Sequence, residues 1–155
     1  MTNVGAQCKF LRASAALKTY LEGAGIQERF SATQNLFREE DTNSGVFLLL
    51  KGRVCMSVRG LSKLDRLFSA GSLLGLPSTF TGHKYSLTAQ ALTEVDAVHV
   101  DQATFLQIMR ERPELCREAT DMLGREVTFI QGALAERRKQ AAKNKVSPAE
   151  LGALI

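Results

Sequence analysis

Short apolar stretches with a period of two dominate the chain between residues 26 and 100. In Arg53–Val58, Ser86–Leu92 and Val95–Val100, apolar side chains recur at every second position, which is the period of a half-buried β-strand. Glycine and polar turn residues separate these stretches, as at Lys51 and Gly52. Several short strands joined by turns predict an antiparallel β-sandwich or barrel.

The period becomes helical on both sides of this region. Residues 1–25 carry apolar side chains, Leu11 among them, near helical spacing and end in two glycines, so we expect an amphipathic N-terminal helix. After the last strand, Asp101 is the expected N-cap of a short helix. Pro113 is the expected first residue of a long helix that extends over 114–138.

The apolar residues of this long helix fall into two groups. One group steps by four, three and four residues, which is heptad spacing: Leu123, Val127, Ile130 and Leu134. The other group includes Met122 and Phe129, and we expect it to pack on the β domain. We expect the heptad group, called the seam below, to meet its own copy in a parallel homodimer. The alternative is that both groups are buried within one chain.

Composition places the chain among ordinary globular proteins. The 155 residues suit one domain, with 45% hydrophobic and 23% charged residues and no run of roughly 20 apolar residues that could span a membrane. The N-terminus lacks the apolar segment of a secretory signal, so a cytoplasmic location is expected. The net charge of +4 is concentrated in a run of cations without an acid: Arg137, Arg138, Lys139, Lys143 and Lys145.

Few residues offer catalytic or metal chemistry. The chain has three cysteines, no Cys-x-x-Cys pair and two histidines, so we expect neither a metal site nor an enzyme. Cys55 and Cys116 are expected to be small buried groups, and His99 a surface residue of the sheet. Cys8 alone cannot hold an iron–sulfur cluster.

The stretch Gly71–Ala91 differs from the strands around it. It contains three glycines, a proline and several hydroxyl side chains between two apolar runs. These residues favour an irregular loop with exposed backbone N–H groups and hydroxyls. We therefore take this stretch as the candidate ligand site.

Several stretches together resemble one known family. They are LFREEDTNSGVFLLLKGRVCMSV at 36–58, the loop at 71–91, ALTEVDAVHV at 91–100 and FLQIMRERPEL at 105–115. In this order they resemble the cyclic-nucleotide-binding domain of the Crp/Fnr regulators over about residues 26–140. The resemblance implies a mainly β fold, an antiparallel double-stranded β-helix or jelly roll, with a long C-terminal dimerisation helix. The implied divisions are 1–25 for an N-terminal helical segment, 26–112 for the β-roll, 113–140 for the dimerisation helix and 141–155 for a basic tail.

The resemblance also implies a phosphate-binding cassette within 71–91. In the family, a short helix presents backbone N–H groups to the cyclic phosphate, an arginine pairs with that phosphate and a glutamate accepts the ribose 2′-hydroxyl. This chain keeps Gly75 and Ser86 of the cassette. Leu76 stands at the glutamate position, Tyr85 at the arginine position and Leu87 at the following alanine position.

Other positions of the family pattern also differ or are only partly kept. Ser78 stands at the small position of the cassette, and Glu40 replaces the glycine that usually precedes Asp41. Ile130 and Gln131 fall near the positions that contact the base. The candidate ligand-binding set is therefore Gly75, Leu76, Pro77, Ser78, Lys84, Tyr85, Ser86, Leu87, Ile130 and Gln131.

Loss of the arginine and the glutamate changes the expected ligand. A charge-assisted hydrogen bond contributes about 1.5–3 kcal/mol, so tight cyclic AMP binding in the usual mode is not expected. Lys84 and His83 could supply a substitute cation, and His83 could alternatively bind haem iron. Leu76, Tyr85 and Leu87 instead favour a more apolar pocket or a loop collapsed on itself. The effector thus remains unassigned at this point.

Crp/Fnr regulators continue after the long helix into a helix-turn-helix domain, whereas this sequence ends at Ile155. We therefore do not expect direct sequence-specific DNA binding by this polypeptide, which is either a stand-alone sensor or a piece of a longer regulator. The expected function is a non-catalytic, effector-sensing regulatory domain. The alternative is a structural dimerisation module with a vestigial pocket.

Overall fold

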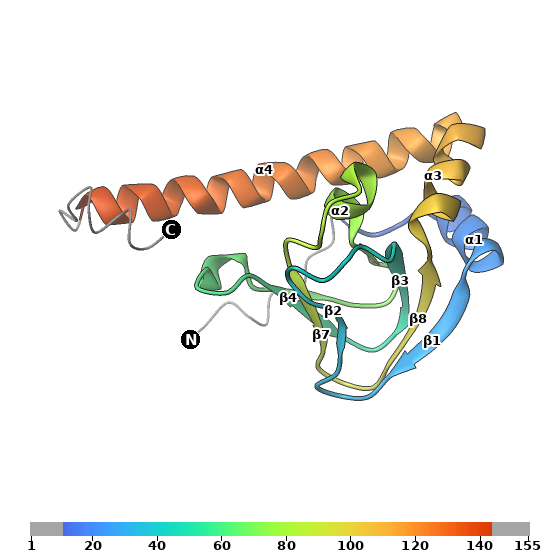
Figure 1. The fold of residues 1–155 in the computed structure, drawn as a ribbon, viewed down its shortest axis with the longest axis horizontal. Helices are drawn as coiled ribbons and strands as arrows, with labels where there is room; N and C mark the ends of the chain where they lie inside the picture. The colour runs from blue at the N-terminus through green and yellow to red at the C-terminus, as the bar shows by residue number, and fades with distance from the viewer. Residues whose placement is uncertain (1–10, 144–155) are drawn as a thin grey trace.

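Two four-stranded antiparallel sheets face each other and form the body of the protein. The computed structural model describes residues 11–143 (Figure 1). The strands are β1 (Ile26–Phe30), β2 (Asn35–Phe37), β3 (Val46–Lys51), β4 (Val54–Ser57), β5 (Arg66–Phe68), β6 (Leu73–Leu74), β7 (Thr88–Ala91) and β8 (Val95–Val100). The helical elements are α1 (Ala15–Ala24), η2 (Ser62–Leu64), α2 (Leu76–Thr81), α3 (Gln102–Glu111) and α4 (Pro113–Lys143).

The strand orders are those of a β-roll. One sheet has the order β1-β8-β3-β6 and the other the order β2-β7-β4-β5, so the chain passes repeatedly between the two sheets. All the strand pairs are antiparallel. The predicted mainly β fold with flanking helices is confirmed, together with the long C-terminal helix.

The burial of the strands explains their two sequence patterns. In β4, Val54 and Met56 are buried while Cys55 and Ser57 are half-buried, which accounts for the alternation seen in the sequence. In β3, the residues from Val46 to Leu49 are all buried, because this strand lies inside its sheet and is covered on both faces.

The N-terminal helix is shorter than predicted. α1 begins at Ala15, after Ser14, whose hydroxyl accepts a hydrogen bond from the Leu17 backbone N–H at 3.2 Å. Leu11 lies outside the helix, beside an isolated β-bridge between Arg12 and Ser72, so its expected helical position is wrong. Leu11 is nevertheless buried in the core. The rest of that prediction, residues 1–10, lies outside the described residues.

The helices that follow the β-roll begin where the sequence indicates. The Asp101 carboxylate accepts a hydrogen bond from the Thr104 backbone N–H at 2.7 Å. Hydrogen bonding from the Thr104 side chain, and then from its backbone, lowers the pKa of the Asp101 carboxyl. α4 begins at Pro113 and continues past the predicted end to Lys143. Of the predicted basic tail, residues 144–155 lie outside the described part of the chain.

The two groups of apolar residues on α4 are buried to different extents. Met122 is buried and Phe129 is half-buried, as predicted for the packed side. Of the seam, Val127 is 39% exposed, whereas Leu123 and Ile130 are half-buried and pack against the core, so the seam is partly covered within one chain. In Figure 1 the C-terminal half of α4 extends beyond the β-roll. No helix within residues 11–143 is long and apolar enough to cross a membrane.

Candidate functional site

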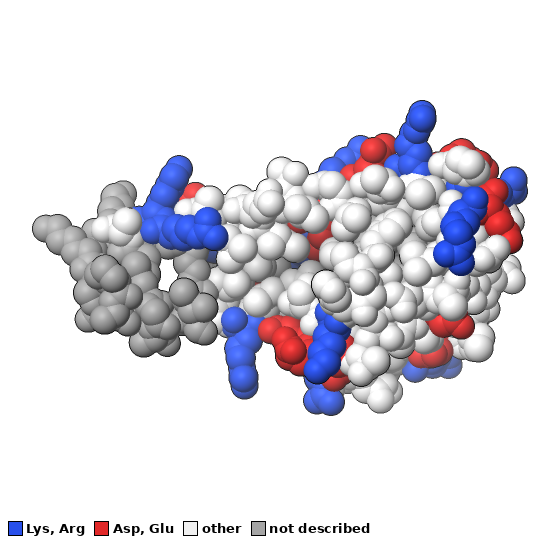
Figure 2. Space-filling view, turned by 45° about the horizontal axis from the view of Figure 1, so that its top comes forward, with Lys and Arg blue, Asp and Glu red and all other residues white. Residues whose placement is uncertain are grey.

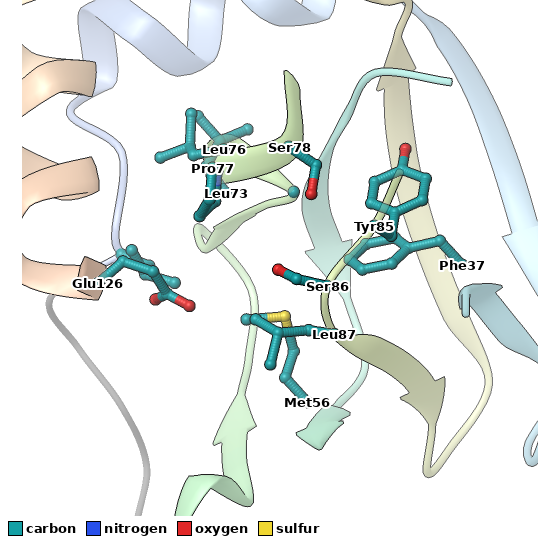
Figure 3. Close-up of a pocket in the computed structure, with 12 residues that line it drawn as sticks. Phe37, Met56, Leu73, Leu76, Pro77, Ser78, Tyr85, Ser86, Leu87 and Glu126 are labelled. Atoms are coloured by element: carbon teal, nitrogen blue, oxygen red, sulfur yellow. The ribbon is translucent and has the colours of Figure 1, made fainter. Parts of the chain in front are cut away.

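A narrow cavity lies between α2, the β-roll and α4. Figure 3 shows the side chains around it. Its lining consists of Leu11, Phe37, Met56, Leu73, Gly75, Leu76, Pro77, Ser78, Tyr85, Ser86, Leu87 and Glu126. The cavity volume is about 10 Å³, which is room for about one water molecule. Seven of the ten candidate ligand-binding residues are therefore brought together, and the site is mainly apolar.

The stretch expected to be an irregular loop contains short regular elements. β6, the short helix α2 and β7 all lie within residues 71–91. Gly75 precedes α2 with a φ of +93°, and a Cβ there would lie 3.0 Å from the Gly45 carbonyl oxygen. Only glycine fits both the left-handed backbone and this close approach without strain. Gly75 thus sets the position of α2 against the loop before β3.

Tyr85 fills the place that the family resemblance gives to an arginine. Its side chain is buried, and its ring stacks on Phe37 with a centroid separation of 4.1 Å. Its hydroxyl donates a hydrogen bond to the Gly45 carbonyl oxygen at 2.7 Å and accepts one from the Ser44 backbone N–H at 3.1 Å. Tyr85 therefore holds the loop before β3 against the cavity wall through these hydrogen bonds, and it supplies no positive charge to the cavity.

The other altered cassette positions make the cavity apolar. Leu76 and Leu87 are both buried and both line it. A leucine side chain has no hydrogen-bond donor or acceptor, so neither residue can bond to a ribose hydroxyl or to a phosphate. Glu40, at the former glycine position, has a φ of +71°, so the backbone keeps a conformation that glycine favours although the residue has changed.

The cavity also contains a charged residue that the sequence analysis did not predict. Glu126 of α4 is 1% exposed, and Figure 3 shows its carboxylate at the cavity wall opposite Tyr85. Its two oxygens accept hydrogen bonds from the two terminal nitrogens of Arg66 in β5, at 2.7 and 2.9 Å. The Arg66 guanidinium also lies over the Phe129 ring, 4.4 Å from its centroid.

This buried pair joins α4 to the edge of a sheet. Two charges removed from water carry a desolvation cost, which their attraction offsets only in good geometry, and the two parallel hydrogen bonds supply that geometry. A sequence signal for the pair exists. Arg66 has the same strand phase as Phe68, and Glu126 lies on the same side of α4 as Met122. A charged residue at a core-facing position of a strand or helix indicates that a residue of opposite charge is buried next to it.

Three candidate residues lie outside the cavity lining. Lys84 is exposed, as is Gln131, and Ile130 is half-buried on α4. His83, proposed with Lys84 as a substitute cation, is exposed as well. Their part in ligand binding therefore stays a prediction, and it requires a ligand that extends beyond this cavity.

Two minor predictions are corrected. His99 is not a plain surface residue: it is half-buried, its Nε2 lies 2.7 Å from the Ser44 carbonyl oxygen and its ring stacks on Phe47. Cys55 and Cys116 are half-buried rather than buried, and burial raises the pKa of the Cys55 thiol. Among residues 11–143, no group of three His, Cys, Asp or Glu side chains is placed to hold a metal ion.

The Arg66–Glu126 pair predicts non-additive stability. Arg66→Met or Glu126→Met alone leaves one buried charge unpaired and should lower the free energy of unfolding by about 3–5 kcal/mol. The double variant should be at least as stable as the parent. Urea unfolding of all four proteins measures the coupling, with the exposed pair Lys63–Glu136, 3.8 Å apart, as a control expected to contribute at most about 1 kcal/mol. If the double variant loses as much free energy of unfolding as the two single variants lose together, the coupling is contradicted.

The Tyr85 hydroxyl should also contribute to stability. Tyr85→Phe keeps the ring on Phe37 but leaves the buried Gly45 carbonyl without this donor, so we expect a loss of about 1–3 kcal/mol in the free energy of unfolding. Tyr20→Phe is the matched control, because Arg112 lies over the Tyr20 ring at 4.8 Å and the substitution keeps that contact. Equal stability of Tyr85→Phe and the parent would contradict the role assigned to the hydroxyl.

Comparison with known proteins agrees with this fold. The family model described as "Cyclic nucleotide-binding domain" matches residues 27–112, more than half of the chain. The nitrogen fixation regulation protein FixK of Bradyrhizobium diazoefficiens is 26% identical over 139 residues, which are 84% of this chain and 55% of FixK. The transcriptional activatory protein AadR of Rhodopseudomonas palustris is 24% identical over 127 residues, 77% of this chain and 50% of AadR.

A solved structure has the same fold. The Catabolite Activator Protein of Thermus thermophilus superposes with a TM-score of 0.72 at 18% identity, over 86% of this chain and 64% of that protein. The chain spans about half the length of FixK and AadR, both of which are named as regulatory proteins rather than enzymes. The resemblance to Crp/Fnr effector domains is confirmed, and the chain belongs to the cyclic nucleotide-binding domain family.

Proposed function

We propose that this chain is a non-catalytic effector-sensing domain of the Crp/Fnr type, with a divergent cassette and with α4 as its output element. The observation that carries the proposal is the cavity itself. Residues of the cassette stretch and one residue of α4, Glu126, share a single lining. A molecule that enters this space touches the sensing loop and the output helix together, so its binding can bias the position of α4.

The cavity lining argues against cyclic nucleotide binding in the usual mode. Tyr85 and Leu76 supply neither the cation nor the carboxylate of a phosphate cassette, and both side chains are buried in the core. The charged group that does line the cavity is the Glu126 carboxylate, which repels a phosphate. Lys84 and His83 are exposed, so a cyclic nucleotide rescued by them would lie partly outside the cavity.

The seam of α4 supports a homodimer as the signalling unit. Val127 is exposed, and the other three seam residues are half-buried. Figure 2 shows that charged side chains are sparse over the middle of the face along which α4 runs. An apolar stripe with heptad spacing that extends past the β-roll suits a parallel contact with a second copy. A structural dimerisation module with a vestigial pocket has the same seam and is the competing function, favoured by the small cavity volume.

Titration calorimetry with cyclic AMP and cyclic GMP tests the divergent cassette. We expect no binding in the micromolar range, because two charge-assisted interactions of about 1.5–3 kcal/mol each are missing, a loss of roughly 10²- to 10⁴-fold in affinity. Micromolar binding that disappears in His83→Ala/Lys84→Ala would instead establish the rescued mode. Failure of a wider panel, including a cyclic dinucleotide and haem, would favour the dimerisation module.

A charge in the seam should dissociate the dimer. Val127→Glu and Ile130→Glu each place a carboxylate in the apolar contact, so sedimentation velocity should show a monomer. Thr128→Glu is the matched control, because Thr128 is exposed on the same helix but outside the seam. A dimer that persists in both seam variants would rule out this interface.

A further inference from the structure

The cavity holds polar groups that the protein leaves available. Ser78, which is 6% exposed, and Ser86, which is exposed, both line the cavity. Figure 3 shows the Ser78 and Ser86 hydroxyls directed toward the space between α2 and Leu87. A hydroxyl that lines a cavity can donate a hydrogen bond to a molecule inside it and accept one from it. The hydroxyls therefore mark a position for a polar group inside an apolar cavity.

The Glu126 carboxylate is the second available polar group. Each of its oxygens accepts one hydrogen bond from Arg66, and a carboxylate has about four acceptor positions. Glu126 belongs to the lining of the cavity, whereas Arg66 does not. An entering molecule thus meets an acceptor and not the guanidinium behind it.

The charge of this arrangement restricts the ligand. Arg66 already neutralises Glu126, so an added cation would introduce an unbalanced charge into a buried region. An anion would have the Glu126 carboxylate as its nearest charged neighbour and would be repelled. The remaining lining is mostly aliphatic and aromatic, with Leu73, Leu87 and Met56 among its members. A neutral molecule with an apolar body satisfies both the charge and the lining.

We propose that the effector of this cavity is an uncharged, mainly apolar molecule that carries an O–H or N–H donor. The O–H or N–H of the effector donates a hydrogen bond to Glu126, the Ser78 hydroxyl bonds to the same polar group, and the apolar body contacts the aliphatic part of the lining. This inference rests on the proposed function, namely that the cavity binds an effector. Because the cavity now has a volume of about 10 Å³, entry requires movement of lining side chains next to α4, such as Leu76.

Four probes that each contain one benzene ring separate the effect of ligand charge from the effect of a hydrogen-bond donor. They are benzyl alcohol, toluene, benzoate and benzylammonium. The readout is the methyl resonance of Met56, which lines the cavity, in protein labelled at the methionine methyls. Met109 is buried in α3 outside the lining and serves as the internal control. At neutral pH, benzyl alcohol should bind about tenfold or more tightly than each of the other three probes.

Variants locate the preference in the cavity. Arg66→Met/Glu126→Met removes the acceptor without leaving an unpaired charge, so benzyl alcohol should lose its advantage over toluene. Ser78→Ala should weaken benzyl alcohol more than toluene, whereas Ser57→Ala, outside the lining, should change neither. If a substitution at the pair prevents folding, the Ser78 and Ser57 variants still test the assignment. Equal effects of Ser78→Ala on the alcohol and on toluene would contradict it.

The outcomes separate the ligand class from the function. Benzoate or benzylammonium binding at Met56 as tightly as benzyl alcohol would overturn the uncharged class but leave an effector-binding cavity. Absence of any saturable Met56 shift with all four probes would overturn both the class and the sensing function, and would favour the dimerisation module. Leu76→Ala enlarges the cavity. If the probes cause no saturable Met56 shift in this variant either, the small volume of the cavity is not the reason that they fail to bind.

Discussion

The buried ion pair between Arg66 and Glu126 decides where the long helix lies. α4 packs against α2 and α3 through its apolar side, but apolar contacts alone tolerate sliding, whereas two parallel hydrogen bonds between buried charges require one register. Because Arg66 is in β5 and Glu126 is in the cavity wall, the same pair connects the edge of a sheet, the cavity and the helix that leaves the β-roll.

Tyr85 acts from the opposite wall of the cavity. Its hydroxyl fastens the loop before β3 through Gly45 and Ser44, and its ring covers Phe37. In our proposal, the position that the family resemblance gives to a phosphate is occupied by the hydrogen-bonded Tyr85 phenol and leucines on one side and by the Glu126 carboxylate, paired with Arg66, on the other. In our proposal, an effector changes the output helix because it must displace side chains that touch both walls.

The sequence alone predicted the parts of this structure that follow local rules. Alternation in 53–58 predicted β4, and the Asp101 cap predicted the start of α3, whereas α2 lies in a stretch predicted to be an irregular loop. It did not predict the partner of Arg66, because pairing across 60 residues depends on how α4 crosses the sheet and not on local periodicity. The same limit applies to Ile130 and Gln131: helix phase alone did not show that Glu126 is the α4 residue at the cavity.

An electron-density map of the purified protein, determined without added ligand, tests the central claim most directly. The account predicts that the Glu126 carboxylate is paired with Arg66, that the Tyr85 hydroxyl contacts the Gly45 carbonyl, and that any co-purified density in the cavity lies against Glu126 and Ser78. Density for a phosphate or another anion bound by Arg66, with Glu126 turned away or Tyr85 displaced toward solvent, would contradict it.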